Sequence, residues 1–301
     1  MELVKLAPQV KDYIWGGDYF KKFNKGIGFE KVSECWELSV RDLDSSIIAS
    51  GPNKDKLLCD IITKEDIGPV ANRFKYFPLL IKLIDAKDNL SVQVHPSDDY
   101  ALKNENSFGK SEMWHIIHAD EGAGLYVGLN KDYSKEEIKK ALENGTIMEC
   151  LNFFPVKPGD TFVIDPGTIH AIGKGVRLIE IQQNSNLTYR LYDYNRVDKF
   201  GNPRELHIAK ALEVINYKKY EPSKPVDGVL ADNKYFTVKE VSFKGEIELS
   251  ANENSFISFT FLSGEGFVND IEYKQYDTFF LPYGKECKIK GKGTLVVSSV
   301  R

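Results

Sequence analysis

Short apolar runs, separated by turn-forming residues, recur along the chain from residue 81 to the C-terminus. The runs are rich in Val, Ile, Phe and Tyr, and the segments between them carry Gly, Pro, Asn and Asp. This pattern is typical of a β-sandwich or a β-barrel, so the chain is predicted to be mainly β. The clearest expected strands span residues 90–94, 113–117, 161–164, 176–182, 236–241, 256–262 and 294–298.

Three other segments have the spacing of amphipathic helices. The clearest covers residues 134–144, where Ser134 and Glu137 form a capping box and a glycine follows directly. Apolar residues three and four positions apart also predict helices over 63–74 and 205–215. A few short helices are therefore expected beside the strands.

One turn-and-strand pattern occurs twice. Residues 157–167 read Lys-Pro-Gly-Asp-Thr-Phe-Val-Ile-Asp-Pro-Gly, and residues 274–284 read Lys-Gln-Tyr-Asp-Thr-Phe-Phe-Leu-Pro-Tyr-Gly. The second copy follows the first by 117 positions, from 160 to 277, and indicates two related β units. In this alignment His170 falls on Cys287, so the second unit lacks whatever His170 contributes.

The stretch between the two copies predicts a domain boundary. Residues 217–229 hold two prolines among lysines, a composition typical of a linker. We therefore expect an N-terminal domain of residues 1–220, with small helical segments, that carries the chemistry. Residues 221–301 would form a C-terminal β domain without metal ligands.

Composition narrows the class of protein. Of the 301 residues, 42% are hydrophobic and 28% charged, which is typical of a globular chain. The net charge of -4 comes without a basic block, so neither nucleic acid nor an anionic membrane is an expected partner. No apolar run resembles a signal peptide or approaches the ~20 residues of a membrane span, so we expect a cytoplasmic protein.

The cysteines do not indicate a structural metal site. Four are present, far apart and without a CxxC pair, so neither a zinc knuckle nor a disulfide framework is predicted. Buried, reduced thiols are expected instead. These four are Cys35, Cys59, Cys150 and Cys287.

Candidate chemistry rests on few side chains, because the chain has only five histidines. The period of two in a strand places Gln93 and His95 on one face, and the following proline ends that strand. Glu112 opens another strand, and a sharp Asp-Pro-Gly turn precedes His170. Together these four residues predict a mixed nitrogen and oxygen site for a borderline cation such as Zn²⁺, with room for water or substrate.

The other three histidines are expected to lie outside this site. His115 falls on the strand face opposite Glu112 and is expected to be a buried, hydrogen-bonded residue. His118 is expected to be exposed near the end of the same strand. His207, beside Arg204 and Glu205, is predicted to be a surface residue or a positioning contact.

The arrangement resembles the cupin β-barrel, in which a His-x-His strand, a following Glu and a Gly-x-x-His turn build the metal site. Here the turn is present before His170, but Gln93 stands where the first histidine is usual. An amide oxygen is a harder ligand than imidazole and favours a redox-silent Lewis acid over an oxygen-activating iron. The resemblance implies two cupin-like barrel or jelly-roll units.

Longer motifs run along most of the chain. They are Trp15-Gly-Gly, Glu34-Cys-Trp-Glu37, Leu90-Ser-Val-Gln-Val-His-Pro-Ser-Asp98, Gly109-Lys-Ser-Glu112, Pro166-Gly-Thr-Ile-His170 and the stretch from Glu180 to Arg196. Together they resemble a narrower family, the type I phosphomannose isomerases in their short bacterial form. By this resemblance His95, Glu112 and His170 would hold one Zn²⁺ per chain, Gln93 would lie in or beside the ligand shell, and Arg190 would be the catalytic arginine.

The resemblance implies an isomerase that interconverts mannose 6-phosphate and fructose 6-phosphate through a cis-enediol (EC 5.3.1.8). Glu180, Lys110 and a metal-bound water are all candidates for the base, and Glu180 and Lys110 are expected to contact substrate. Arg190, Arg196 and Lys199 could meet the phosphate. The partner would be a small sugar phosphate, and the chain would be a monomer or a homodimer.

Two alternatives stay open at this point. Another metal-dependent cupin enzyme acting on a sugar would use the same ligands, and a non-catalytic sugar-phosphate-binding cupin could have kept them. Metal identity and substrate would separate these possibilities.

Overall fold

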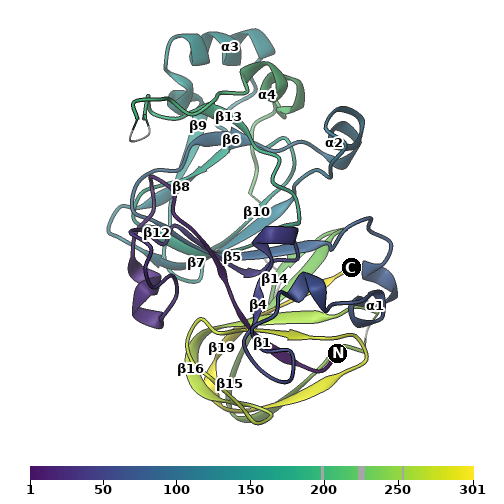
Figure 1. Ribbon diagram of the computed structural model, residues 1–301. Helices are drawn as coiled ribbons and strands as arrows, with labels where there is room; N and C mark the ends of the chain where they lie inside the picture. Colours follow the sequence, from purple (N-terminus) through teal and green to yellow (C-terminus); the bar gives the residue numbers. More distant parts are fainter. Residues whose placement is uncertain (198–199, 223–227, 253) are drawn as a thin grey trace.

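A computed structural model describes residues 1–197, 200–222, 228–252 and 254–301 (Figure 1). The fold is mainly β, as predicted, and its strands form three sheets. In Figure 1 two of these sheets lie in the upper part of the molecule, and the third, which contains the C-terminal strands, lies below them.

The first sheet has six antiparallel strands in the order β10-β7-β12-β5-β3-β2. All eight residues of its strand at 79–86 are buried, because this sheet is covered on both faces. One face packs into the core shared with the C-terminal sheet through residues such as Ile81, Leu83 and Ile179. The strands are β2 (Gln9–Lys11), β3 (Glu34–Leu38), β5 (Leu79–Ala86), β7 (Glu112–Ala119), β10 (Thr161–Ile164) and β12 (Val176–Gln183).

The second sheet has five strands in the order β13-β6-β11-β8-β9. Its register places His170, Gln93 and Arg190 in one row across three neighbouring strands. The strands are β6 (Val92–Val94), β8 (Gly124–Leu129), β9 (Leu151–Pro155), β11 (His170–Ile172) and β13 (Tyr189–Tyr192).

The third sheet combines the two ends of the chain. Strand β1 pairs with β18 on one side and with β4 on the other, so two early strands belong to the sheet of the C-terminal residues. The division at residue 220 stays a prediction, and part of the linker, 223–227, lies outside the described residues. The strands are β1 (Val4–Ala7), β4 (Ile47–Ile48), β14 (Val229–Asp232), β15 (Phe236–Ser250), β16 (Ile257–Val268), β17 (Ile271–Tyr273), β18 (Thr278–Leu281) and β19 (Glu286–Val300).

The repeated motif forms the same turn in both places. The carboxylate of Asp160 accepts a hydrogen bond from the Lys157 amide at 2.9 Å, and that of Asp277 accepts one from the Lys274 amide at 2.7 Å. Each turn then leads into a strand, β10 or β18. The shared geometry is compatible with two related units.

The three predicted helices are present with shorter bounds. The capping box of Ser134 and Glu137 starts the clearest one, as expected. The helix predicted over 63–74 is interrupted at Gly68, whose φ of 80° is not helical. The helix at 98–104 was not predicted. The helices are α1 (Lys64–Ala71), α2 (Asp98–Asn104), α3 (Lys135–Glu143) and α4 (Ile208–Val214).

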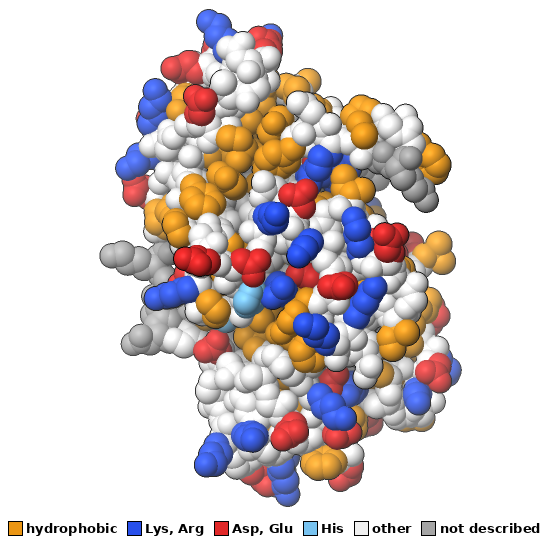
Figure 2. Space-filling model, turned by 90° about the vertical axis from the view of Figure 1, so that its left-hand side faces the viewer, with side chains coloured by type: hydrophobic (Ala, Val, Ile, Leu, Met, Phe, Trp, Pro, Cys, Tyr) orange, Lys and Arg blue, Asp and Glu red, His pale blue; other side chains and the backbone are white. Residues whose placement is uncertain are grey.

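The four cysteines are unpaired, and Cys59 is partly exposed whereas the other three are buried. Over the described part of the chain, no helix combines the length and apolar character that crossing a bilayer requires. Figure 2 shows acidic and basic side chains interspersed on one face of the molecule.

A buried ion pair lies where the first sheet meets the C-terminal core. The Lys25 ammonium lies 2.8 Å from the carboxylate of Glu37, which is fully buried. Burial raises the pKa of Glu37, whereas the charge of Lys25 opposes that shift.

We predict that Lys25→Met lowers the free energy of unfolding by about 3–5 kcal/mol, because it leaves a buried carboxylate without its cation. The double variant Lys25→Met, Glu37→Gln should recover part of that loss. Urea unfolding measures both. A loss below about 1 kcal/mol for the single variant would show that the pair is not needed for stability.

Candidate active site and metal centre

Three of the predicted ligands converge in the space between the first two sheets. His95 directly follows β6, Glu112 begins β7, and His170 begins β11. One ligand atom from each lies within 4.8 Å of the others, and all three residues are buried. Residues far apart in sequence thus form one compact group.

Backbone carbonyls orient both imidazoles. Nδ1 of His95 lies 2.8 Å from the Leu187 carbonyl, and Nδ1 of His170 lies 2.9 Å from the Thr168 carbonyl. A carbonyl can only accept, so each Nδ1 carries the proton and each Nε2 lone pair faces the group. Burial lowers the pKa of His170 to about 4 and also lowers that of His95, which keeps both rings neutral.

The carboxylate of Glu112 lies between these rings. Its oxygens lie 3.3 Å from Nε2 of His170, 3.5 Å from Nε2 of His95 and 2.5 Å from Nζ of Lys110. Burial opposes its ionisation, yet the ammonium of Lys110 holds the pKa of Glu112 well below its usual value.

Neither oxygen of Glu112 accepts a hydrogen bond of ordinary geometry from the described residues, despite the close approach of Lys110. A buried, ionised carboxylate of this kind is costly unless it is paired or binds a metal. Two imidazole lone pairs beside it complete a donor set that fits a divalent cation.

Gln93 lies next to this group. Its side-chain nitrogen is 3.3 Å from Nε2 of His170, and its backbone pairs with His170 on one side and Arg190 on the other. The amide is therefore placed beside the predicted metal ligands, and it also lines the adjoining pocket.

A chain of alternating charges crosses the first sheet toward Glu112. Lys82 lies 2.9 Å from a Glu180 oxygen and 3.6 Å from Glu34, and Lys110 lies 3.9 Å from Glu180. Burial disfavours the charge of Lys82, but Glu180 and Glu34 raise its pKa above the usual value. All five residues are buried, so each charge is tolerated because an opposite charge is its neighbour.

Strand register builds part of this chain. Trp36, Lys82, Glu180 and Trp114 lie directly opposite one another on β3, β5, β12 and β7. The indole of Trp114 donates to Glu180 at 2.9 Å and fixes the second oxygen of that carboxylate. The sheet therefore holds Glu180 in one orientation.

A pocket of about 270 Å³ adjoins the group of His95, Glu112 and His170, called the metal group below because these residues could hold a metal ion. It brings together Gln93, Lys110, Glu180 and Arg190, as the site predicted from the sequence requires. Its wall also holds three charged residues for which no role was predicted, Glu34, Lys82 and Arg204. One feature of the sequence could have pointed to Lys82: it is the only cation in the apolar run of β5.

Arg190 is held on the pocket wall by neighbours from two elements. Its Nη1 donates to the Glu205 carbonyl at 2.8 Å and its Nε to the Ser91 hydroxyl at 3.3 Å. Its backbone amide also donates to Nδ1 of His207 at 3.3 Å, so His207 is a positioning contact, as one of its two predicted roles requires. Burial and the nearby Arg204 lower the pKa of Arg190.

The remaining residues named in advance lie elsewhere. His115 is buried and hydrogen-bonds to Thr161 at 2.9 Å, and His118 is partly exposed, so both lie outside the group as expected. Arg196 is not among the residues that line the pocket, and Lys199 lies outside the described residues.

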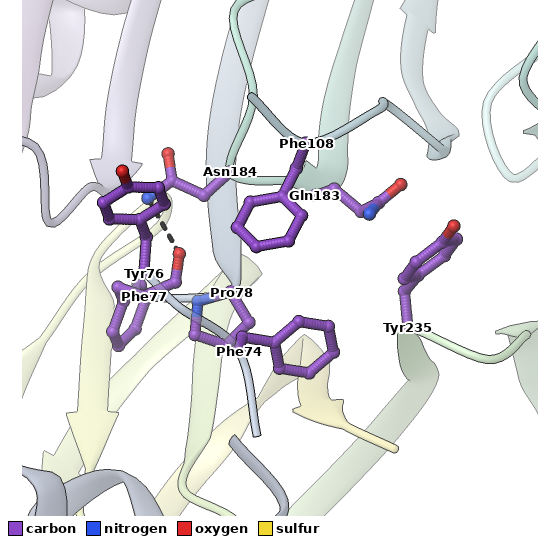
Figure 3. A pocket seen from close by; sticks show the side chains of 8 residues that line it. All are labelled: Phe74, Tyr76, Phe77, Pro78, Phe108, Gln183, Asn184 and Tyr235. Carbon is purple, nitrogen blue, oxygen red and sulfur yellow. Dashed lines mark hydrogen bonds between the residues drawn. The ribbon is translucent and has the colours of Figure 1, made fainter. Parts of the chain in front are cut away.

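A second cavity lies where the first and third sheets meet (Figure 3). Aromatic side chains, among them Phe74, Phe108 and Tyr235, surround it, and Asn184 donates to the Phe77 carbonyl beside it at 3.0 Å. Its volume of about 10 Å³ would hold about one water molecule. The polar pocket beside Glu112 is thus the better candidate for a substrate site.

Comparison with known proteins identifies relatives along the whole chain. A family model described as "Phosphomannose isomerase type I, catalytic domain" matches residues 3–112. The mannose-6-phosphate isomerase ManA of Bacillus subtilis is 36% identical over 97% of this chain and 96% of its own length. The probable mannose-6-phosphate isomerase GmuF of the same organism is 39% identical over 89% of each chain.

Solved structures agree with this relationship. The crystal structure of mannose 6-phosphate isomerase from Bacillus subtilis superimposes with a TM-score of 0.88, at 34% identity and 99% coverage of both chains. A putative mannosephosphate isomerase from Archaeoglobus fulgidus, at 24% identity, shares the fold with a TM-score of 0.81. At this identity and coverage, the chain belongs to the type I phosphomannose isomerase family.

Proposed function

We propose that the chain is a zinc-dependent isomerase that interconverts mannose 6-phosphate and fructose 6-phosphate through a cis-enediol. The observation that carries the proposal is the buried group of His95, Glu112 and His170 next to a pocket with acidic and cationic side chains. An aldose-ketose isomerisation requires a base and positively charged groups, because it moves a proton and builds negative charge on two oxygens. The relatives' names supply the substrate.

The ligand set favours zinc. Two neutral imidazoles and one carboxylate are common ligands of Zn²⁺, and they leave a position open for a further ligand. His95, Glu112 and His170 would hold the ion, with Gln93 beside them. Bound there, Zn²⁺ would act as a Lewis acid that stabilises negative charge on the substrate oxygens.

Glu180 is the base that the contacts favour. Lys82 lies at one of its oxygens and the Trp114 indole donates to the other, so the two contacts hold this carboxylate in a fixed position on the pocket wall. In the proposed reaction this carboxylate removes the proton from C2 of the open-chain aldose. The C–H electron pair forms the C1–C2 double bond, and the π pair of the C1 carbonyl moves onto O1, which takes up a proton to give the enediol. The C1–C2 π pair then accepts the proton at C1, while O2 loses its proton and its O–H electron pair forms the C2 carbonyl of the ketose, so that one proton is gained at O1 and one is lost from O2.

Lys110 and Arg190 would stabilise the charge that develops. Lys110 can donate N–H groups to the carbonyl oxygen, because its ammonium lies beside Glu112 at the pocket wall. Arg190 presents a planar, positively charged donor from the facing sheet. Donors fixed in advance on two sheets need little rearrangement during the reaction.

Other expectations stay predictions. Unpaired cysteines fit the reducing cytoplasm. A monomer or homodimer is still expected. Another metal-dependent cupin activity, or sugar-phosphate binding without turnover, would be the conclusion if the following assay fails.

Purified protein should convert mannose 6-phosphate to fructose 6-phosphate, lose that activity on chelation, and regain it with added zinc. A coupled assay for fructose 6-phosphate measures all three states. Folded, zinc-loaded protein without turnover would contradict the proposed function.

His170→Ala should lose bound zinc, because it removes one of two imidazole ligands. Metal content by atomic emission, after dialysis, measures this without reference to activity. His118→Ala is the matched control, since that imidazole lies outside the group and is partly exposed. Equal zinc in both variants would remove His170 from the ligand set.

Glu180→Gln should lower kcat by about 10²–10⁴-fold, the range expected for loss of a general base. Exchange of the C2 hydrogen of mannose 6-phosphate with D₂O should fall in parallel, as NMR can measure. Lys110→Met is the comparison. If Glu180→Gln still exchanges that hydrogen while Lys110→Met does not, Lys110 is the base instead.

A further inference from the structure

A second guanidinium, that of Arg204, lies on the pocket wall with Arg190. Asp193 holds it through two hydrogen bonds, from Nε at 2.7 Å and from Nη2 at 2.5 Å. These two bonds use two of the five N–H donors of the side chain. No other hydrogen bond to Arg204 is seen among the described residues, so its outer edge is available to a ligand.

Positive charge exceeds negative charge at this end of the pocket. Asp193 is buried, and it also accepts a hydrogen bond from Arg196 at 2.5 Å, so one carboxylate serves two guanidiniums. Arg190 lies close enough that Arg204 lowers its pKa. Arg190 and Arg204 both line the pocket here, and Asp193 shares its charge with Arg196 outside the pocket, so an anion between the two pocket arginines would be favoured.

The geometry of β13 places this charge away from the metal group. Arg190 pairs with Gln93, beside His170, whereas Asp193 follows the end of β13 three residues farther on. Three residues of extended chain span about 10 Å. A six-carbon sugar phosphate carries its reacting carbons and its phosphate at opposite ends, so its two ends match the two ends of the pocket.

We propose that Arg204 binds the substrate phosphate and that Asp193 is the residue that positions it. The inference rests on the proposed function for the identity of the sugar. It also gives Arg204 a role that Arg196, in the same loop, does not have. Arg196 donates to the Asn89 carbonyl at 2.6 Å and to Asp193, and it does not line the pocket.

The test uses sorbitol 6-phosphate, which has no carbonyl and cannot be isomerised. Calorimetry with zinc-loaded protein measures its dissociation constant, and melting temperature and zinc content show that each variant is intact. Arg204→Ala should weaken binding by about 10- to 100-fold, the value of hydrogen bonds to a charged group. Arg204→Lys keeps the charge but loses the planar donors, so its dissociation constant should lie between those of the wild type and Arg204→Ala.

Arg196→Ala is the matched control, because it removes the other guanidinium bound to Asp193. Its affinity for sorbitol 6-phosphate should stay within about twofold of wild type, since Arg196 does not line the pocket. Unchanged affinity in folded Arg204→Ala, or an equal loss in Arg196→Ala, would overturn the assignment.

Steady-state kinetics give a second readout. Arg204→Ala should raise KM for mannose 6-phosphate with kcat nearly unchanged, because the phosphate is bound alike before and during the reaction. Asp193→Asn should raise KM less, and should add nothing in an Arg204→Ala background if it acts through Arg204. An additive effect would reject the positioning role.

The two proposals fail in different ways. If the wild-type protein isomerises mannose 6-phosphate, but Arg204→Ala binds sorbitol 6-phosphate as tightly as the wild type does, only the assignment of Arg204 to the phosphate is wrong. If the wild-type protein does not isomerise mannose 6-phosphate, but its binding of sorbitol 6-phosphate depends on Arg204, only the proposed isomerase reaction is wrong.

Discussion

Burial of ionised side chains between two sheets is the constraint on which the site depends. Glu34, Lys82, Glu180, Lys110 and Glu112 follow one another with alternating charge, and removal of any member would take a counter-charge away from a neighbour in a poorly solvated position. The backbone hydrogen bonds of four strands fix the spacing between them. The same sheet is apolar on its other face, where it packs on the C-terminal core. Chemistry and stability therefore use opposite faces of one sheet.

Local patterns brought out the candidate ligands, because each lies next to the end of a strand. Gln93 with His95, Glu112, and the turn before His170 are all of this kind. Periodicity could not assign Lys82 to the pocket, since one lysine in an apolar run can point to either face until the neighbouring strands are known. Arg204 was missed for a different reason. It lies in a loop after β13, and only the three-dimensional contact with buried Asp193 distinguishes it from a solvated arginine.

The repeated turn shows a further limit of local reasoning. The repeated turn was correctly found, and Asp160 and Asp277 make equivalent hydrogen bonds. Yet the second copy has a tyrosine, Tyr276, where the first has Gly159. Both residues have a positive φ, 67° for Tyr276 and 93° for Gly159. That tyrosine packs edge-on against Phe20 and Phe23 from the N-terminal part. Aromatic contacts between distant segments can offset the backbone cost of such a conformation, and sequence spacing does not reveal them.

The pairing of β1 with β18 has a consequence for synthesis on the ribosome. Residues 4–7 are synthesised long before their hydrogen-bonding partners at 278–280. Until then the apolar face of β5 and β12 has no C-terminal core to cover it. Contacts this distant in sequence slow folding, and exposed apolar sheet surface favours aggregation. Until residues 278–280 are made, the growing chain would therefore present a hydrophobic surface of the kind that chaperones bind.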